Sequence, residues 1–396
     1  MYILLLLTER KAMVIIMKAV AAIDSFKGSL SAIEAGNAVK EGILRVFSDA
    51  VVDVRPLADG GEGTVNAIVS EKNVDFNKVF VCNPLGKKIE TTYAVDKKSN
   101  TAFIEMSSAT GITLIGESER NPLNTTTYGV GEIIKDAILK GCRKFIIGIG
   151  GSATNDGGIG MLEALGFEFL NKDKIPVQKG AKGLEELFLI KADNALKELS
   201  ECEFHIACDV QNPLCGENGC SFVYGPQKGA STKMIKDMDR WLSAYAVLTK
   251  EINKNSDPNM PGAGAAGGMG FAFSAYLNAT LESGINLIIR ETGLEEYIKN
   301  ADIVITGEGR LDGQTDMGKA PTGVALTAKK YNKPVLAFSG AVTKDAKNCN
   351  NSGIDAFFPI TRTPCSLSDA MDKENAFNNM ADTVEQVFRL IKLYKN

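Results

Sequence analysis

Short apolar runs rich in β-branched residues recur along the chain, and segments with helical spacing lie between many of them. Within each run the apolar residues are consecutive rather than alternating, which is typical of parallel strands covered on both faces. Strands that alternate with helices along a chain predict an α/β architecture. The runs interpreted as buried strands are 18–23 (KAVAAI), 51–57 (VVDVRPL), 101–106 (TAFIEM), 144–149 (KFIIGI), 204–210 (FHIACDV), 301–307 (ADIVITG), 334–340 (PVLAFSG) and 355–360 (DAFFPI).

The middle of the chain departs from this pattern, and 396 residues are too many for one small core. Residues 89–95 and 101–106, joined by DKKSN, predict an antiparallel hairpin, and 261–273 is too rich in glycine for an ordinary helix start. We therefore expect a Rossmann- or flavodoxin-like parallel-sheet domain with a second, mixed α/β domain inserted into it. The expected bounds are 1–16 for an N-terminal extension, 17–84 and 287–396 for the discontinuous Rossmann/flavodoxin-like domain, and 85–286 for the inserted domain.

Composition excludes several classes of protein. The formal net charge is −4 and no cluster of lysine and arginine is found, so the chain lacks the basic surface of a nucleic-acid-binding protein. Eight cysteines without a CxxC pair indicate free thiols in a reducing cytosol, which predicts a cytoplasmic protein. No apolar run is long enough to span a membrane. The only histidine, His205, lies inside an apolar run, which disfavours histidine-dependent catalysis. Whether the chain forms a homo-oligomer is left open.

Polar residues gather directly after five of the predicted strands. In open α/β sheets, ligands bind beyond the carboxyl ends of the strands. One such group would indicate only a turn or a helix cap, but five groups with carboxylates, cations and close-packed glycines favour a shared binding site. The groups are DSFKGS (24–29), ADGGEGT (58–64), GGSATNDGG (150–158), Asp209, and GEGRLDGQT (307–315) with Lys319 shortly after it.

These parts together predict phosphoryl transfer. That reaction needs backbone donors and cations around the phosphates, carboxylates for Mg²⁺, and a carboxylate that orients or deprotonates the attacking hydroxyl. Glycines let backbone N–H groups approach an anion closely, and the helix that follows favours negative charge. The segment GIGGSATNDGG has this form, although it is not the Walker A pattern GxxxxGK[ST].

Long and unusual motifs follow one another along the chain. They are DSFKGSLSA, ADGGEGT, NPLNTTTYGVGE, IGIGGSATNDGG, ACDVQNPLCG, FVYGPQKGA, PGAGAAGGMGF, VITGEGRLDGQT and GKAPTGVA. In sequence and in order these motifs resemble those of the bacterial glycerate kinase type-1 family. The resemblance covers nearly the whole chain from residue 17 to about 360, and it implies an ATP-dependent kinase that acts on D-glycerate with Mg²⁺ and has the two-domain fold described above. Ile23 departs from the family, whose members usually have proline before the aspartate of the first motif.

Roles are assigned to individual residues by their chemistry. Asp312 is the preferred base for the glycerate hydroxyl, with Asp209 as the alternative. Arg310 is expected to bind the glycerate carboxylate, unless it forms a salt bridge with Glu308. Lys27 is interpreted as a phosphate or carboxylate clamp, with a solvated loop lysine as the alternative. Asp24 could orient Lys27 or cap the turn instead of binding substrate. The remaining assignments are Asp24, Ser25, Lys319, Thr125, Thr126 and Thr127 for substrate or phosphate, Gly150, Gly151, Ser152 and Asn155 for ATP, and Asp59 and Glu62 for Mg²⁺.

Two other functions were weighed against a glycerate kinase. A regulator that binds glycerate or a nucleotide without turnover is disfavoured, because a pure anion sensor gains nothing from carboxylates at its site. A dinucleotide oxidoreductase is disfavoured because the full GxGxxG pattern with a later acidic residue is missing. As the product, 2-phosphoglycerate is favoured over 3-phosphoglycerate, although the sequence alone does not decide between the two hydroxyls.

Overall fold

The computed structural model describes residues 16–58, 63–70, 72–313 and 319–395. The chain divides into two compact units. Unit 1 consists of Met1–Pro56, Glu296–Asp312 and Ala325–Asn396, and unit 2 of Leu57–Glu295 and Gly313–Val324. Each unit has its own sheet and its own hydrophobic core. The domain bounds expected from the sequence differ from these division points and stay a prediction.

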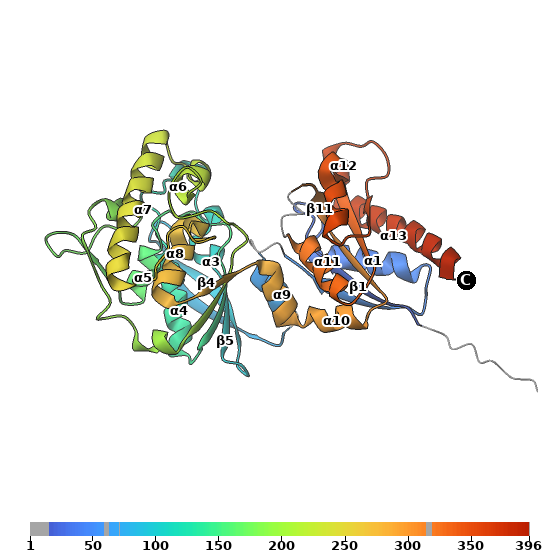
Figure 1. Cartoon of the computed structure of the whole chain (residues 1–396), viewed down its shortest axis with the longest axis horizontal. Coiled ribbons are helices and arrows are strands. Elements are labelled where there is room, and N and C mark those ends of the chain that lie inside the picture. Colours follow the sequence, from blue (N-terminus) through green and yellow to red (C-terminus); the bar gives the residue numbers. More distant parts are fainter. Residues whose placement is uncertain (1–15, 59–62, 71, 314–318, 396) are drawn as a thin grey trace, which may run out of the picture. The chain divides into compact units, whose positions relative to one another are not determined.

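Unit 1 is built on a five-stranded sheet in the order β13-β12-β11-β1-β2, and all of its neighbouring strands pair in parallel (Figure 1). Counted along this unit alone, the order is 2-1-3-4-5, which is the order of flavodoxin-like folds. The predicted parallel sheet is therefore confirmed. The strands are β1 (Lys18–Ile23), β2 (Val51–Pro56), β11 (Ile303–Leu311), β12 (Val335–Val342) and β13 (Ala356–Pro359).

The helices of unit 1 cover this sheet and bury its apolar strands. Ser31 and Glu34 form a capping box at the start of α1, with the Ser31 N–H donating to Glu34 Oε2 at 2.8 Å. α1 and α13 lie side by side and share one core cluster, to which Val39 and Val384 both belong. The helices are α1 (Ala32–Leu44), α10 (Leu294–Asn300), α11 (Ala320–Lys330), α12 (Leu367–Met371), α13 (Lys373–Lys395) and the 3₁₀ helix Lys344–Ser352; α10 and α11 each cross a division between the units.

Unit 2 is built on a six-stranded mixed sheet in the order β10-β9-β6-β5-β4-β3. Its first four strands are parallel, whereas β4 runs antiparallel to both β5 and β3. The pairing of β4 with β5 confirms the predicted hairpin. The strands are β3 (Asp75–Cys82), β4 (Lys88–Asp96), β5 (Thr101–Glu105), β6 (Lys144–Gly148), β9 (Glu203–Ala207) and β10 (Thr280–Glu282), with a separate pair β7 (Glu168–Leu170) and β8 (Leu189–Lys191).

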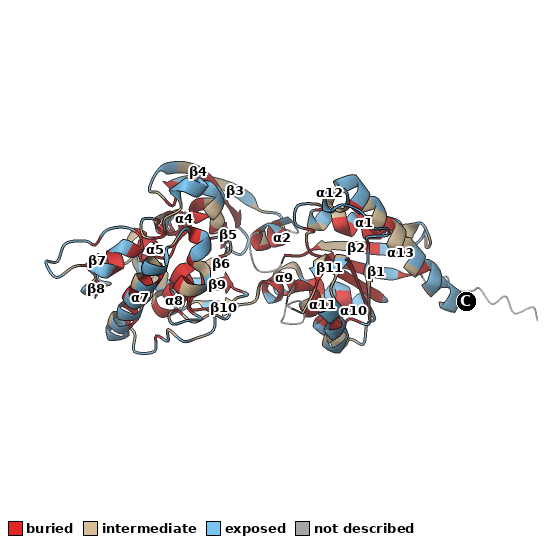
Figure 2. Cartoon of the chain, turned by 90° about the horizontal axis from the view of Figure 1, so that it is seen from above, coloured by how far each residue is buried: buried red, intermediate tan, exposed pale blue. Residues whose placement is uncertain are grey.

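Helices pack on this second sheet, and its inner strands β5 and β6 are almost fully buried (Figure 2). The glycine-rich start of α8 is irregular, as expected, because Ala266, Gly267 and Gly268 have positive φ. A Cβ on Gly267 would lie 2.2 Å from the carbonyl oxygen of Thr154, so only glycine allows this close approach. The helices are α2 (Thr64–Ser70), α3 (Ser107–Thr110), α4 (Tyr128–Leu139), α5 (Ile159–Ala164), α6 (Cys220–Tyr224), α7 (Thr232–Ile252), α8 (Ala265–Leu277) and α9 (Gly284–Thr292), with 3₁₀ helices at Ile112–Leu114, Glu117–Glu119, Ala181–Glu185, Lys197–Glu201 and Pro226–Lys228.

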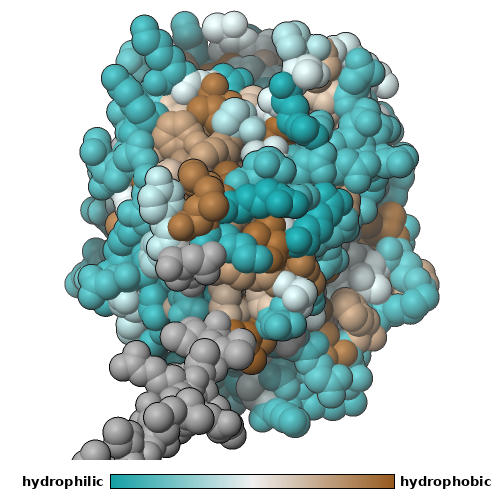
Figure 3. Space-filling model, turned by 90° about the vertical axis from the view of Figure 1, so that its right-hand side faces the viewer, coloured by the Kyte–Doolittle hydropathy of each residue, from teal (hydrophilic) through white to brown (hydrophobic). Residues whose placement is uncertain are grey.

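Hydrophilic residues dominate the face of the molecule shown in Figure 3, with smaller groups of hydrophobic residues between them. Scattered apolar side chains of this kind are normal on a protein surface. None of the helices in the described ranges combines the length and the apolar character that crossing a membrane requires.

Candidate active site

The carboxyl ends of β1 and β11 lie next to each other, because the two strands pair in parallel. This is the point of a flavodoxin-like sheet at which the strand order reverses and a crevice forms. The backbone N–H of Asp24, just after β1, donates to the carbonyl oxygen of Gly307 at 2.9 Å. A Cβ on Gly309 would lie only 3.4 Å from the Cα of Phe26. The segments DSFKGS and GEGRLD therefore contact each other at this edge.

The turn after β1 presents Lys27 to solvent. Phe26 and Leu30 are buried, and the Phe26 N–H donates to the Leu30 carbonyl oxygen at 2.8 Å. Gly28 has a φ of +80°, which lets the chain reverse without strain. Because the residues on either side face the core, the exposed Lys27 side chain is the one that extends outward. Asp24 is buried, and one of its carboxylate oxygens accepts from the Ser25 N–H at 2.6 Å.

Arg310 and Asp312 lie at the end of β11. The sequence placed the end of this strand at residue 307, but β11 continues to Leu311, whose N–H donates to Ser339 Oγ at 3.0 Å. Arg310 is therefore a strand residue opposite Ala341 of β12. Its side chain is 66% exposed and lies 3.6 Å from Asp312, measured from Nε to Oδ2, whereas Asp312 is only 23% exposed.

The second sheet has its own group of polar residues at the carboxyl ends of β5, β6, β9 and β10. Asp209, after β9, accepts the N–H of Gly284 at the start of α9 at 2.9 Å. Glu105, at the end of β5, accepts the N–H groups of Gly63 and Val65 at 3.2 and 2.8 Å. Glu105 was missed from the sequence, where it reads as the polar end of an apolar run. Through these bonds it holds the start of α2. The predicted metal ligands Asp59 and Glu62 lie outside the described residues.

The three predicted threonines are buried and bonded inside unit 2. Thr125 Oγ1 donates to the Ala153 carbonyl oxygen at 2.9 Å, and Thr126 Oγ1 accepts the Tyr128 N–H at 3.2 Å. The Thr127 N–H and hydroxyl both donate to Asp156 Oδ2, at 2.8 and 2.9 Å. Burial raises the pKa of Asp156, and the bonds from Thr127 oppose that rise. Thr125 and Thr127 thus bond to the loop after β6, whereas Thr126 bonds to the backbone at the start of α4.

The loop after β6 is exposed at its first turn and buried beyond it. Gly151 is exposed with a φ of +70°, whereas Ser152 is 8% and Asn155 0% exposed. Lys228, which the sequence did not single out, is 2% exposed and donates to Ser152 Oγ at 2.9 Å. Burial lowers the pKa of Lys228 to about 8. Its only sequence signal was its place in the motif FVYGPQKGA.

Lys319 lies in unit 2, half-buried, directly before α11. Its carbonyl oxygen accepts the Gly323 N–H at 3.1 Å. The predicted site residues that the structure describes thus form two groups. The group in unit 1 consists of Asp24, Ser25, Lys27, Arg310 and Asp312, and the group in unit 2 of Thr125, Thr126, Thr127, Gly150, Gly151, Ser152, Asn155, Asp209 and Lys319.

Known proteins are similar to this chain in sequence and in fold. A model of the glycerate kinase family matches residues 19–392. The chain belongs to the glycerate kinase family. A glycerate kinase of Haemophilus influenzae is 43% identical over 375 residues, which cover 95% of this chain and 99% of that protein. The Escherichia coli protein named glycerate 2-kinase is 43% identical over 364 residues, covering 92% of this chain and 95% of its own.

A solved structure leads to the same family. A Salmonella typhimurium LT2 crystal structure described as glycerate kinase 2 is similar with a TM-score of 0.86 and 43% identity, and the match covers 96% of this chain and 99% of the other. As a family member the chain is an ATP-dependent small-molecule kinase, so it is an enzyme and not the binding protein without turnover that the sequence left open.

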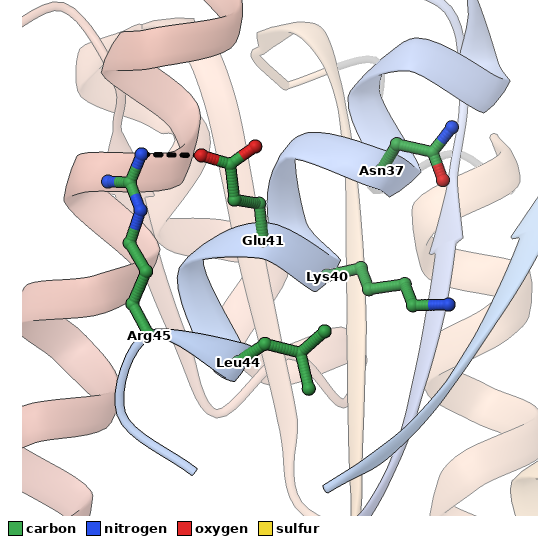
Figure 4. A pocket seen from close by; sticks show the side chains of 5 residues that line it. All are labelled: Asn37, Lys40, Glu41, Leu44 and Arg45. Carbon is green, nitrogen blue, oxygen red and sulfur yellow. Dashed lines mark hydrogen bonds and ion pairs between the residues drawn. The ribbon is translucent and has the colours of Figure 1, made fainter. Parts of the chain in front are cut away.

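The kinase also has a pocket away from these strand ends (Figure 4). It has a volume of about 500 Å³ and is lined by Asn37, Lys40, Glu41, Leu44 and Arg45. The Arg45 side chain lies across it in an ion pair of 2.6 Å with Glu41. None of the residues predicted for catalysis or binding lines this pocket, which belongs to the outer side of α1 and the residue after it.

A Mg²⁺ ion would need few ligands from this kinase. Mg²⁺ in such sites is typically held by one or two carboxylates together with substrate phosphates and water. Within the described ranges no three His, Cys, Asp or Glu side chains are grouped closely enough to hold a metal.

Proposed function

We propose that this kinase transfers the γ-phosphoryl group of ATP to a hydroxyl of D-glycerate and that the product is 2-phosphoglycerate. The observation that carries the proposal is the group at the carboxyl ends of the adjoining strands β1 and β11, where an exposed lysine, an exposed arginine and a carboxylate are found. The 43% identity to the Escherichia coli protein named glycerate 2-kinase supports the choice of product.

Arg310 is assigned to the carboxylate of glycerate. Its guanidinium is largely exposed, and a planar guanidinium can form two parallel hydrogen bonds with a carboxylate. Asp312 is the proposed base. Its carboxylate lies 3.6 Å from Arg310, so a small molecule bound by that arginine would bring a hydroxyl within reach of it. Asp209 remains the alternative base, although its bond to Gly284 also gives it a capping role.

Lys27 is assigned to the transferred phosphoryl group, whose developing charge a positioned cation stabilises. Gly150, Gly151, Ser152 and Asn155 are assigned to ATP, with the exposed Gly151 turn as the part that accepts phosphates. Asp24 and Ser25 shape the turn that carries Lys27. Lys319 is assigned to a phosphate, because it directly precedes the helix α11, whose N-terminus favours negative charge. Thr125 and Thr127 support the ATP loop through the buried bonds described above.

Mg²⁺, held by Asp59 and Glu62 together with phosphate oxygens, would neutralise charge on the transferred group. The direct test is incubation of the protein with ATP, Mg²⁺ and D-glycerate, followed by identification of the product by phosphorus NMR. The expected result is stoichiometric ADP and 2-phosphoglycerate. A product phosphorylated at the 3-hydroxyl would overturn the regiochemistry alone, and ATP consumption without a phosphorylated glycerate would overturn the substrate.

A further inference from the structure

One short segment of unit 2 holds the loop after β6 from its buried side. Lys228 Nζ donates to Ser152 Oγ at 2.9 Å and to the carbonyl oxygen of Thr154 at 2.6 Å. From the same segment, Ser221 Oγ accepts the side-chain amide of Asn155 at 2.9 Å. Three of four consecutive loop residues are thus bonded to α6 and the 3₁₀ helix that follows it.

The other side of the loop is held by the backbone. The Gly151 carbonyl oxygen accepts the Ile112 N–H at 2.9 Å, and the Ala153 N–H donates to the Thr110 carbonyl oxygen at 2.9 Å. Ser152 lies between these two bonds and faces Lys228. The orientation of the exposed Gly150–Gly151 turn therefore depends on where Ser152 is held.

Burying a lysine side chain at this position is energetically unfavourable. Its side chain is among the most fully buried in unit 2, and burial of an ammonium group carries a large desolvation cost unless hydrogen bonds compensate. The fall of its pKa to about 8 reflects that cost. Stability alone is a weak reason for a buried cation, because an apolar side chain of similar volume often serves the fold as well or better.

We propose that Lys228 is a positioning residue for ATP, which holds Ser152 and Thr154 so that the backbone N–H groups of Gly150 and Gly151 face the phosphates. This inference rests on the assignment of the loop to ATP. Lys228 does not touch the nucleotide and acts through the loop.

The test compares Lys228→Met and Lys228→Gln with Lys233→Met, which removes an exposed lysine in the first turn of α7. The dissociation constant of a non-hydrolysable ATP analogue with Mg²⁺ is measured by calorimetry without glycerate, next to the KM for glycerate and the melting temperature. In Lys228→Met the analogue should bind about tenfold more weakly or worse, since small displacements of positioning groups cost up to about 100-fold. Lys228→Gln keeps one donor and should fall between Lys228→Met and the wild type.

The KM for glycerate should stay within about threefold of the wild-type value in both variants, and Lys233→Met should match the wild type. Unchanged analogue affinity in Lys228→Met would overturn the inference. So would a parallel loss of affinity, glycerate KM and melting temperature, or failure of both Lys228 variants to fold, because either result assigns Lys228 to the fold alone. Because the binding measurement needs no glycerate, a wild type that binds the analogue but phosphorylates no glycerate would overturn the proposed function and leave this inference intact.

Discussion

The backbone N–H of Asp24 donates to the carbonyl oxygen of Gly307 at 2.9 Å, which joins the turn after β1 to the neighbouring strand β11. This bond extends the parallel pairing of the two strands by one residue beyond Ile23. Lys27 lies in the turn after β1, and Arg310 lies near the end of β11. Two cations that are far apart in the sequence are therefore found at the same edge of one sheet. We propose that these two cations bind the anionic substrate of this acidic kinase.

Lys27→Met should lower kcat by about 100-fold or more, because loss of one donor to transition-state charge typically costs about 10²–10³-fold. Its effect on stability should stay within about 0.5 kcal/mol, since the side chain is exposed. Steady-state kinetics and urea unfolding on the same preparation measure both quantities. The matched control is Lys40→Met, which removes another exposed lysine of unit 1. A kcat close to the wild-type value would return Lys27 to the role of an ordinary solvated loop residue.

Asp312→Asn should reduce single-turnover phosphorylation of glycerate by about 10²–10⁴-fold, the usual contribution of a general base, and leave ATP affinity nearly unchanged. Asparagine keeps the shape of the side chain and loses its charge, so a structural role should survive the substitution. Asp209→Asn is the companion variant, in which the amide oxygen can still accept the Gly284 N–H. If Asp209→Asn is inactive and Asp312→Asn lies within about threefold of the wild type, the base is Asp209.

The repeated apolar runs were sufficient to predict the five strands of unit 1 and the buried strands β5, β6 and β9 of unit 2, because parallel strands buried on two faces have a recognisable composition. They did not predict β3 and β10 at the edges of the second sheet. The end of β11 was not predictable in this way. It depends on the bond from Leu311 to Ser339 and on the pairing of Arg310 with Ala341, and both partners belong to a strand about 30 residues further along the chain. Local composition carries no information on such a partner.

For the candidate site, too, local sequence was not enough to predict the contacts of individual side chains. Sequence motifs pointed to Thr125, Thr126 and Thr127 as polar residues, but polarity does not reveal whether a hydroxyl faces a ligand or a buried carbonyl group. The structure gives these hydroxyls internal partners, such as the Ala153 carbonyl oxygen for Thr125. Conversely, nothing in the motif FVYGPQKGA indicates that Lys228 is buried, and only the packing around it shows this.

Asp59→Asn should raise the Mg²⁺ concentration for half-maximal rate more than it raises the KM for glycerate, because the substitution removes a charged oxygen ligand. The measurement is a Mg²⁺ titration of the rate at saturating ATP and glycerate, with Asp53→Asn as a control, since Asp53 lies within β2 rather than after it. Chelation of the metal should abolish turnover in all variants. An unchanged Mg²⁺ dependence in Asp59→Asn would remove this residue from the metal site.

Glu163→Gln should change how stability depends on pH. Glu163 lies on α5, where burial raises its pKa from 4.5 to about 7, Lys179 opposes the rise and Asp156 adds to it. Between these two values the folded protein holds a proton on Glu163 that the unfolded chain has released. The free energy of unfolding therefore falls as pH rises from about 4.5 to about 7, and the contribution of Glu163 is constant outside that window. Its full size is at most about 3–4 kcal/mol, at about 1.4 kcal/mol per pKa unit.

Glutamine cannot ionise, so the variant should lose this slope and gain stability relative to the wild type as pH rises through the window. Urea unfolding at several pH values between about 4 and 8 measures the difference, a range that spans both pKa values of the linkage. Glu186→Gln is the control, because that side chain is exposed and its removal should leave the slope unchanged. Wild-type and Glu163→Gln curves that run parallel across the window would show that Glu163 titrates alike in the folded and unfolded states, contrary to the burial of its carboxyl group on α5.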